Sequence, residues 1–407
     1  MADEAPRAAA VVTPWYPSRE LPFRGSFVKA MVGATAPGCD SFVVYHCDPW
    51  VAPMDPCTTA AVEAANAELL LLAAHPVPTS GGADLLHFPV TTPRGQGYGA
   101  QALNHERQLR NALGGRPINA SVVHAHVGLP SGWAALQNAR DDARVFVTEH
   151  ASFLDRILQD PEARELYDEL LHRVTGFFAV GDRVTEVLSR EFPHHAERIL
   201  RIPNPISFDE PRNSTVKELG RWLYLGSMVK TKGVDWLVDA FAECYADDPT
   251  LSLTLVGDGP LRGPLTERVA ELGLDEVVKL PGAIPHEQAL ELMREHDLLV
   301  HPSRYETFGM TIVEGVAAGM PVLATRCGGP EKTLAGIEEA AAELVKIEEN
   351  TEHLSEGFRR LRHRFHAGTL DLPLAQKVLN ARYGYEAVAE THYRFWFPTG
   401  ERAGVLD

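Results

Sequence analysis

Short runs of apolar, β-type residues alternate with segments of helical spacing along most of the chain, and this alternation constrains the fold more than any other feature. It is typical of parallel β-sheets whose strands are joined by helices. In the first half we predict strands at 8–13, 41–45, 121–124, 144–148 and 176–180, and helices at 26–36 and 161–174. In the second half we predict strands at 221–225, 251–256, 277–280, 297–301 and 321–324, and helices at 234–245, 261–272, 287–296 and 310–318. The chain is therefore expected to form two successive α/β sheets.

A proline-rich stretch between residues 202 and 212 interrupts the pattern, as a stiff connection between domains would. We predict an N-terminal domain of residues 1–205 and a C-terminal domain of residues 206–375. The tail, residues 376–407, has apolar and aromatic residues at helical spacing and is expected to be helical. Because ligands bind beyond the carboxyl ends of parallel strands, two such sheets facing each other would form a cleft.

Composition and charge exclude several classes of protein. The 407 residues include 45% hydrophobic and 23% charged residues, as in globular proteins. The net charge of −17 disfavours nucleic acid and anionic lipid as partners. Five cysteines without a Cys-x-x-Cys pair indicate neither a disulfide framework nor a zinc ribbon, and a reducing cytoplasm is expected. The longest apolar run, at 69–74, is far shorter than the about 20 residues of a membrane span. We therefore expect a cytoplasmic protein without stable membrane insertion, and leave its oligomeric state open.

The segment from His301 to Thr325 carries the most specific chemical signal. Glu306 precedes a glycine, Gly309, that leads directly into a predicted helix containing Glu314. The first backbone N–H groups of a helix lack intrahelical partners and attract anions. We therefore predict an anion site formed by the amides of Phe308, Gly309, Met310 and Thr311.

The order glutamate, Phe-Gly, glutamate, glycine and proline in this segment resembles the signature of the family 4 glycosyltransferases, which are retaining enzymes of the GT-B fold. The resemblance covers nearly the whole chain. It implies two Rossmann-like, doubly wound domains facing a central cleft, with the acceptor bound by residues 1–205 and the nucleotide sugar by residues 206–375. The tail would cross back to the N-terminal domain. The resemblance also implies that Glu306 faces the hydroxyls of the donor sugar and that Glu314 faces those of the ribose. Carboxylates suit this role because they only accept hydrogen bonds.

The stretch from Gly226 to Gly233 is similar to the family loop in which an arginine and a lysine clamp the diphosphate. Lys232 stands at the lysine position, but Ser227 stands at the arginine position. A hydroxyl thus replaces a bidentate, charged group. This departure leaves open how strongly the diphosphate is bound and whether Lys230 compensates.

Four further positions are expected at the site through the same resemblance. Gly257 lies in a glycine turn near the nucleotide, and Ile284 follows the segment whose backbone reads the base. Gly25 opens the first helix and would face the diphosphate from the acceptor domain. His150 ends a predicted strand and would contact the C6 hydroxyl of the sugar, near the reacting carbon. His124 and His126 also end a strand, but no cysteine or carboxylate pattern supports a metal site with His150.

The function predicted is retaining transfer of a hexose or amino sugar from a nucleotide diphosphate sugar, a UDP-sugar rather than a GDP-sugar, to a hydroxyl of a small soluble acceptor. An acidic chain suits a cationic acceptor such as an aminocyclitol. The expected catalytic residues are His150, Lys232 and Glu306, with neither metal nor cofactor. Two alternatives stay open: a catalytically inactive sugar-nucleotide sensor, motivated by Ser227, and a transferase acting on a lipid-linked or polysaccharide acceptor. An epimerase of the same fold would need carboxylates arranged for elimination, which the sequence does not identify.

Overall fold

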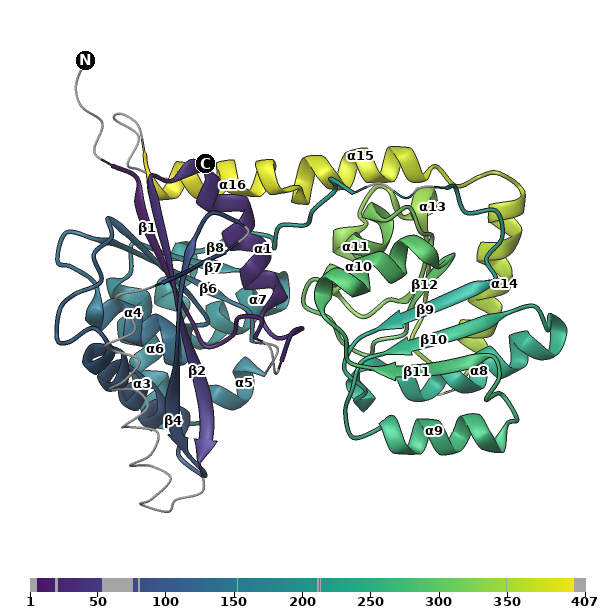
Figure 1. Cartoon of the computed structure of the whole chain (residues 1–407), viewed down its shortest axis with the longest axis horizontal. Coiled ribbons are helices and arrows are strands. Elements are labelled where there is room, and N and C mark those ends of the chain that lie inside the picture. The colour runs from purple at the N-terminus through teal and green to yellow at the C-terminus, as the bar shows by residue number, and fades with distance from the viewer. Residues whose placement is uncertain are drawn as a thin grey trace. The chain divides into compact units, whose positions relative to one another are not determined.

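The protein divides into two compact units, each an α/β sheet (Figure 1). The computed structural model describes residues 6–18, 21–52, 76–79, 81–151, 153–210, 212, 214–348 and 350–398. Of these, the residues up to 17, residues 24–205 and the residues from 388 onward form the first unit. Residues 18–23 and 206–387 form the second.

The sheet of the first unit has eight strands. Their spatial order is β3 (Val77–Pro78), β4 (Asp84–Pro93), β2 (Ser41–Ala52), β1 (Ala8–Thr13), β5 (Val122–His126), β6 (Arg144–Glu149), β7 (Gly176–Ala179) and β8 (Ile199–Arg201). All neighbours are parallel except β3 and β4. The carboxyl ends of the parallel strands therefore meet at one edge, where Thr13 and Glu149 lie.

Helices cover both faces of this sheet. On one face, α1 (Ser26–Thr35) and the part of α16 (Tyr385–Trp396) from Val388 onward pack over Phe42, Phe146 and Phe178. The opposite face is covered by α3 (Tyr98–Ala112), α4 (Trp133–Asn138), α5 (Leu154–Ile157), α6 (Pro161–Arg173) and α7 (Asp182–Glu191). Short helical turns lie at Ala36–Gly38, Gly128–Gly132 and Pro193–Arg198.

The second unit has a sheet of six parallel strands. Their order is β11 (Val278–Gly282), β10 (Ser252–Val256), β9 (Arg221–Leu225), β12 (Leu298–His301), β13 (Val322–Thr325) and β14 (Ala342–Val345). One face is covered by α8 (Val234–Asp247), α9 (Arg262–Glu271) and α14 (Glu352–His366). The other is covered by α10 (His286–Glu295), α11 (Met310–Ala317), α12 (Gly329–Thr333), α13 (Glu338–Ala341) and α15 (Leu372–Tyr383). A short turn at Lys230–Lys232 precedes α8.

The prediction of two parallel-sheet, Rossmann-like units is confirmed, but β3, β4, β8 and β14 were missed. Two prolines, Pro89 and Pro93, lie within β4, and prolines in a run argue against a strand. The alanine-rich start of β14 reads as a continuation of the preceding helix. Strand β2 also runs seven residues beyond the predicted end at Tyr45, because β4 pairs with it as far as Ala52. Among the described residues, no helix is both long and apolar enough to cross a membrane.

The C-terminal tail is two helices rather than one. Ala375 and Leu379 of α15 are fully buried in the core of the second unit, so the tail joins the first unit at Val388 and not at residue 376. From there Trp396 is buried beside Phe42, and its indole N–H donates to Nδ1 of His124 at 3.2 Å. The Tyr393 hydroxyl donates to the Thr35 carbonyl oxygen at 2.7 Å. Residues 399–407 of the predicted tail lie outside the described part of the chain.

Candidate active site

Two glycines allow the loops at the carboxyl edge of the second sheet to pack closely. Gly257 has a φ of 139°, and a Cβ there would lie 1.9 Å from the carbonyl oxygen of Gly226. Gly233 has a φ of 64°, and a Cβ there would lie 1.8 Å from the carbonyl oxygen of Pro302. Only glycine permits such approaches. They bring Lys232, at the end of the turn after β9, beside the loop that follows β12.

Lys232 forms an ion pair with Glu306, 74 residues further along the chain. The same carboxylate oxygen, Oε1, lies 3.1 Å from Nε2 of His301 and accepts a hydrogen bond from the Ser303 hydroxyl at 3.3 Å. Strands β9 and β12 are neighbours in the sheet, which is why their loops meet. Three side chains thus hold one carboxylate at the carboxyl edge.

The surroundings of Glu306 keep it ionised. Burial alone would raise the pKa of this carboxyl, because desolvation disfavours the charged form. The hydrogen bond and charge of His301, together with the charge of Lys232, outweigh burial and lower the pKa to about 2. At neutral pH Glu306 therefore only accepts hydrogen bonds, which is the state that suits recognition of hydroxyl groups.

The loop after Glu306 leads into the start of α11. Gly309 adopts a left-handed conformation with a φ of 83°, and its carbonyl oxygen accepts hydrogen bonds from the amides of Ile312 and Val313. Phe308 is anchored by a ring contact with Tyr383 at 5.1 Å between centroids. The amides of the first turn, which include those of Met310 and Thr311, have no acceptor inside the helix. This terminus is suited to an anion.

Glu314 lies on α11 and is almost completely buried. Its Oε1 is 2.8 Å from Nε2 of His286, the first residue of α10. Burial, and to a smaller extent the charge of Glu314, raise the pKa of the Tyr385 hydroxyl to about 12. Neither His286 nor Tyr385 was predicted, since their distance from Glu314 along the chain hides the contact.

The loop after β9 carries Ser227 at the position where the family has an arginine. Both Ser227 and Lys230 have exposed side chains. Arg304 lies next to this loop and donates to the Lys230 carbonyl oxygen, but its guanidinium is also paired with Asp235 at 2.7 Å and stacked 3.3 Å over the Trp236 ring. Arg304 therefore braces the loop and does not occupy the position of the missing arginine.

The remaining donor-side positions follow neighbouring strands. The amide of Gly257 donates to the carbonyl oxygen of Gly282 at 2.9 Å, which keeps the ends of β10 and β11 side by side. Ile284 follows β11, is half-buried and packs against the core on the α11 side. The structure thus gathers the predicted residues of the second unit at the carboxyl edge of one sheet.

In the first unit, Gly25 and His150 also lie near the carboxyl edge. Gly25 has a φ of 76°, and a Cβ there would lie 2.4 Å from the carbonyl group of Trp15, so the turn into α1 requires glycine. Two residues later, the Phe27 ring packs against the His150 ring at 4.3 Å. Burial lowers the pKa of His150 to about 3, so its imidazole is neutral at physiological pH.

Glu149, which the sequence did not single out, fixes the backbone that carries His150. One carboxylate oxygen accepts hydrogen bonds from the amides of His150 at 2.8 Å and Ala151 at 2.7 Å. The other accepts from the amide of Gly128 at 2.8 Å and from the Tyr167 hydroxyl. Four neutral donors thus satisfy a fully buried carboxylate.

His124 and His126 are buried and engaged with protein groups rather than arranged around a common point with His150. Nε2 of His124 lies 2.7 Å from the Thr148 hydroxyl, and Nδ1 of His126 lies 2.8 Å from Nε2 of His150. Their rings stack at 5.2 Å. The stacked rings of His124, His126 and His150 form a row that begins at Trp396 of α16, which donates to His124.

Two family models match successive parts of the chain. Residues 207–364 match the model described as glycosyl transferases group 1, and residues 59–210 match the model described as glycosyltransferase family 4. The matches meet at the boundary between the two units. They assign both halves of the chain to the glycosyltransferases.

Relatives of known sequence and structure agree with this assignment. The chain is 25% identical to the alpha-D-kanosaminyltransferase of Streptomyces kanamyceticus over 69% of its own length and 78% of the relative. It is 28% identical to the 2-deoxystreptamine glucosyltransferase of the same organism, of which the match spans about half, 51%. Among solved structures, the sucrose-phosphate synthase of Thermosynechococcus elongatus superposes with a TM-score of 0.71 at 19% identity, covering 96% of this chain and 98% of the other. HepE of Anabaena, in complex with UDP and glucose, gives a TM-score of 0.67 at 16% identity, covering 96% and 100%. These structures show the GT-B fold.

Proposed function

Because the chain belongs to the family 4 glycosyltransferases of the GT-B fold, we propose that it is a retaining enzyme that transfers a hexose or amino sugar from a nucleotide diphosphate sugar to a hydroxyl of a small acceptor. The observation that carries this proposal is the cluster of Lys232, His301 and Glu306 next to the start of α11. Lys232 and the first amides of α11 suit a diphosphate, and the ionised carboxylate of Glu306 suits the hydroxyls of a sugar.

The ion pair between Lys232 and Glu306 suggests how the donor binds. Without a donor, each charge neutralises the other at the edge of the sheet. An incoming diphosphate offers Lys232 a second anionic partner, and the sugar hydroxyls offer hydrogen-bond donors to Glu306. The amides from Phe308 to Thr311 hold the phosphates, and Glu314 accepts from the ribose hydroxyls. Lys232 and Glu306, which pair with each other in the free protein, are therefore the residues that contact the donor in this proposal.

The reaction proceeds on one face of the sugar. The bond from the anomeric carbon to the phosphate oxygen breaks, and the bond to the acceptor oxygen forms on the same side. The departing phosphate oxygen takes the proton of the acceptor hydroxyl. Glu306 is occupied with sugar hydroxyls, so no carboxylate is assigned as a nucleophile. Lys232 and the helix amides stabilise the charge that develops on the diphosphate, without a metal ion at this site.

His150 of the first unit completes the assignment. Its imidazole is neutral because burial lowers its pKa, so it offers a hydrogen bond to a sugar hydroxyl without adding charge near the anomeric carbon. Glu149 and Phe27 hold it in place. We assign Gly25 to the diphosphate, since its turn allows close approach of the backbone.

Two features support the choice of donor and acceptor. HepE is known in complex with UDP and with UDP-glucose, and we extend this donor class to the present chain. One relative is named for transfer of a kanosaminyl group, an amino sugar, and another for transfer of a glucosyl group to 2-deoxystreptamine, an acceptor that carries amino groups. The net charge of −17 suits such a cationic acceptor. We therefore propose a UDP-sugar donor and an aminocyclitol-type acceptor.

The first experiment is a thermal-shift comparison of UDP, GDP, ADP and TDP in the absence of added metal. A ligand at 100 times its dissociation constant stabilises the folded state by about 2.7 kcal/mol, which is readily detected. Stabilisation by UDP and formation of a glycosylated aminocyclitol with the donor's anomeric configuration are expected. Stabilisation by none of the four contradicts the proposed donor site.

The exposed Ser227 favours one second candidate, a sugar-nucleotide sensor that binds its ligand without turnover. A serine at this position offers the diphosphate no charged, bidentate group. The negative charge that develops on the diphosphate in the transition state would therefore be stabilised less. Two results together would favour the sensor. The chain would bind a UDP-sugar without hydrolysing it or transferring it to an aminocyclitol, and Ser227→Arg would not gain turnover.

A further inference from the structure

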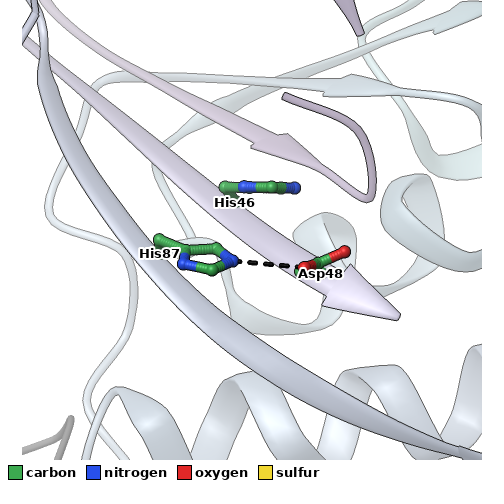
Figure 2. A group of neighbouring side chains, drawn as sticks. All are labelled: His46, Asp48 and His87. Atoms are coloured by element: carbon green, nitrogen blue, oxygen red, sulfur yellow. Dashed lines mark hydrogen bonds and ion pairs between the residues drawn. The ribbon is translucent and has the colours of Figure 1, made fainter. Parts of the chain in front are cut away.

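Three side chains with metal-binding atoms gather in the first unit, on two strands that carry none of the residues assigned to the donor. His46 and Asp48 lie on β2, and His87 lies on the neighbouring strand β4. Because β2 and β4 pair in register with His46 opposite His87, the two imidazoles lie side by side. Their rings stack at 4.7 Å between centroids, as Figure 2 shows, with His87 directed at Asp48.

The spacing of the three groups matches what a small divalent cation needs. Nε2 of His87 lies 3.3 Å from Oδ2 of Asp48, and the ligand atoms of all three residues lie within 4.8 Å of one another. In a tetrahedral zinc site with bonds of 2.0–2.2 Å, two ligand atoms are about 3.4 Å apart. The Asp48–His87 pair already has this spacing, and the widest pair has to close by no more than about 1.4 Å.

His46 supplies the strongest indication of a missing ligand. Its side chain is buried, with 2% of the residue exposed, and its Nε2 has no hydrogen-bond partner. The ring is also hydrogen-bonded to the backbone of Pro14, which has no N–H and offers only its carbonyl oxygen. Since Nε2 has no partner, Nδ1 donates this hydrogen bond, and Nε2 keeps an unshared electron pair. Metal-bound histidines are commonly oriented by this kind of hydrogen bond from the other ring nitrogen.

The groups around the cluster leave Asp48 able to bind. Arg24 lies 3.7 Å from Oδ1 of Asp48, and the Trp50 indole N–H donates to Oδ2 at 3.1 Å. These contacts orient the carboxylate toward the two histidines. The side chain of His87 is 40% exposed, which provides an entry path from solvent.

We propose that His46, Asp48 and His87 form a binding site for a divalent transition-metal ion of the zinc type. Two imidazoles and one carboxylate are a ligand set that Zn²⁺ and similar ions prefer over Mg²⁺ or Ca²⁺. The ion would hold β2 and β4 to the loop after β1 through Pro14. Three protein ligands leave a fourth position for water or another ligand. The site lies next to Arg24, the sequence neighbour of Gly25, but metal binding there does not depend on the proposed transfer reaction.

A second group of the first unit provides a matched control. Asp168, His194 and His195 also bring three such atoms within 4.8 Å, but His194 and Asp168 are 59% and 50% exposed. Solvated side chains of this kind pair with each other without needing an ion. The variant His194→Ala therefore removes an exposed histidine of the same unit and leaves the His46 cluster intact.

The test is a titration of the tag-free, full-length chain, stripped of metal by a chelator, with Zn²⁺ followed by calorimetry and with Co²⁺ followed by absorption. One site per chain is expected, with the intense visible absorption of tetrahedral Co²⁺. Both His87→Ala and Asp48→Asn should weaken binding at least about tenfold, while His194→Ala should leave it unchanged. His87 is partly exposed, so its variant is expected to fold, and circular dichroism checks this. Absence of stoichiometric binding, or binding that is the same in His87→Ala as in the unaltered chain, would overturn the proposal.

Discussion

Each unit of the protein encloses one glutamate near the carboxyl end of a strand, and the two are held in different ways. Glu149, the last residue of β6, accepts hydrogen bonds from three backbone amides and a tyrosine hydroxyl. Glu306, in the loop after β12, is paired with Lys232 and contacts His301 and Ser303. The first carboxylate is fully buried, whereas the side chain of the second remains 11% exposed.

This difference separates a carboxylate that shapes a loop from one that meets a ligand. Three of the four donors around Glu149 are backbone amides, which cannot leave without unfolding the loop, and the fourth is the hydroxyl of the fully buried Tyr167. The lysine partner of Glu306 is a flexible side chain that is 30% exposed and can turn to another anion. We therefore expect changes at Glu149 to act mainly on stability and changes around Glu306 to act mainly on turnover.

Replacing the partner of Glu306 should have the largest effect. Lys232→Ala removes a cation that stabilises the departing diphosphate, and turnover should fall by about 10²–10³-fold, equivalent to about 2.7–4 kcal/mol. The midpoint of thermal unfolding should also fall, because Glu306 loses one of the partners that keep it ionised, but turnover should fall far more. Lys217→Ala, which removes an exposed lysine of the same unit outside this loop, is the matched control in steady-state assays. Near-normal turnover of Lys232→Ala would break the contrast between the two glutamates.

Glu149→Gln should reduce the free energy of unfolding by about 3 kcal/mol, because an amide group replaces one of two acceptor oxygens and leaves buried donors unsatisfied. Chemical denaturation measures this loss. Glu169→Gln on the exposed side of α6 is the control, with a side chain that is 48% exposed. If Glu149→Gln is as stable as the unaltered chain but loses activity, Glu149 belongs with Glu306 and the distinction fails.

The pH dependence of stability should report Glu306. Its pKa is about 2 in the folded protein against an ordinary value of 4.5, so the ionised form stabilises the fold above pH about 4.5. This contribution is lost as pH falls from there toward 2. Over that range the unaltered chain should lose roughly 2–3 kcal/mol that Glu306→Gln does not lose, allowing for screening by solvent. Parallel stability curves of the two proteins would show that Glu306 is not held in its ionised form.

The smallest effect is expected at Glu314. Glu314→Ala removes an acceptor for the ribose hydroxyls and should weaken UDP binding about tenfold, or about 1.4 kcal/mol. Calorimetry with UDP measures the change, and Glu291→Ala on the exposed side of α10 is the control. An unchanged affinity would place the ribose elsewhere and leave Glu306 as the sole glutamate of the donor site.

The sequence predicted most of the strands and, through the family signature, the residues now proposed to bind the donor, but it missed several tertiary contacts and strand β4. Residues from Glu306 to Glu314 are close along the chain, and the geometry of a helix start follows from local backbone rules. His301 and Ser303, which contact Glu306, are also close to it along the chain, whereas Lys232 lies 74 residues away and is brought to Glu306 by the pairing of β9 with β12. Strand β4 was missed because its prolines lowered its predicted strand character, and with it went the pairing that places His87.

By itself the sequence determined the α/β alternation, the boundary near residue 205 and the family, because each depends on residues close in the chain. Tertiary structure alone decided that Lys232 pairs with Glu306, that Glu149 is enclosed by Gly128 and Tyr167, and that His46 meets His87. These contacts depend on which strands are neighbours and in which register. A single sequence does not specify that order, since many pairings of short apolar strands bury similar surface.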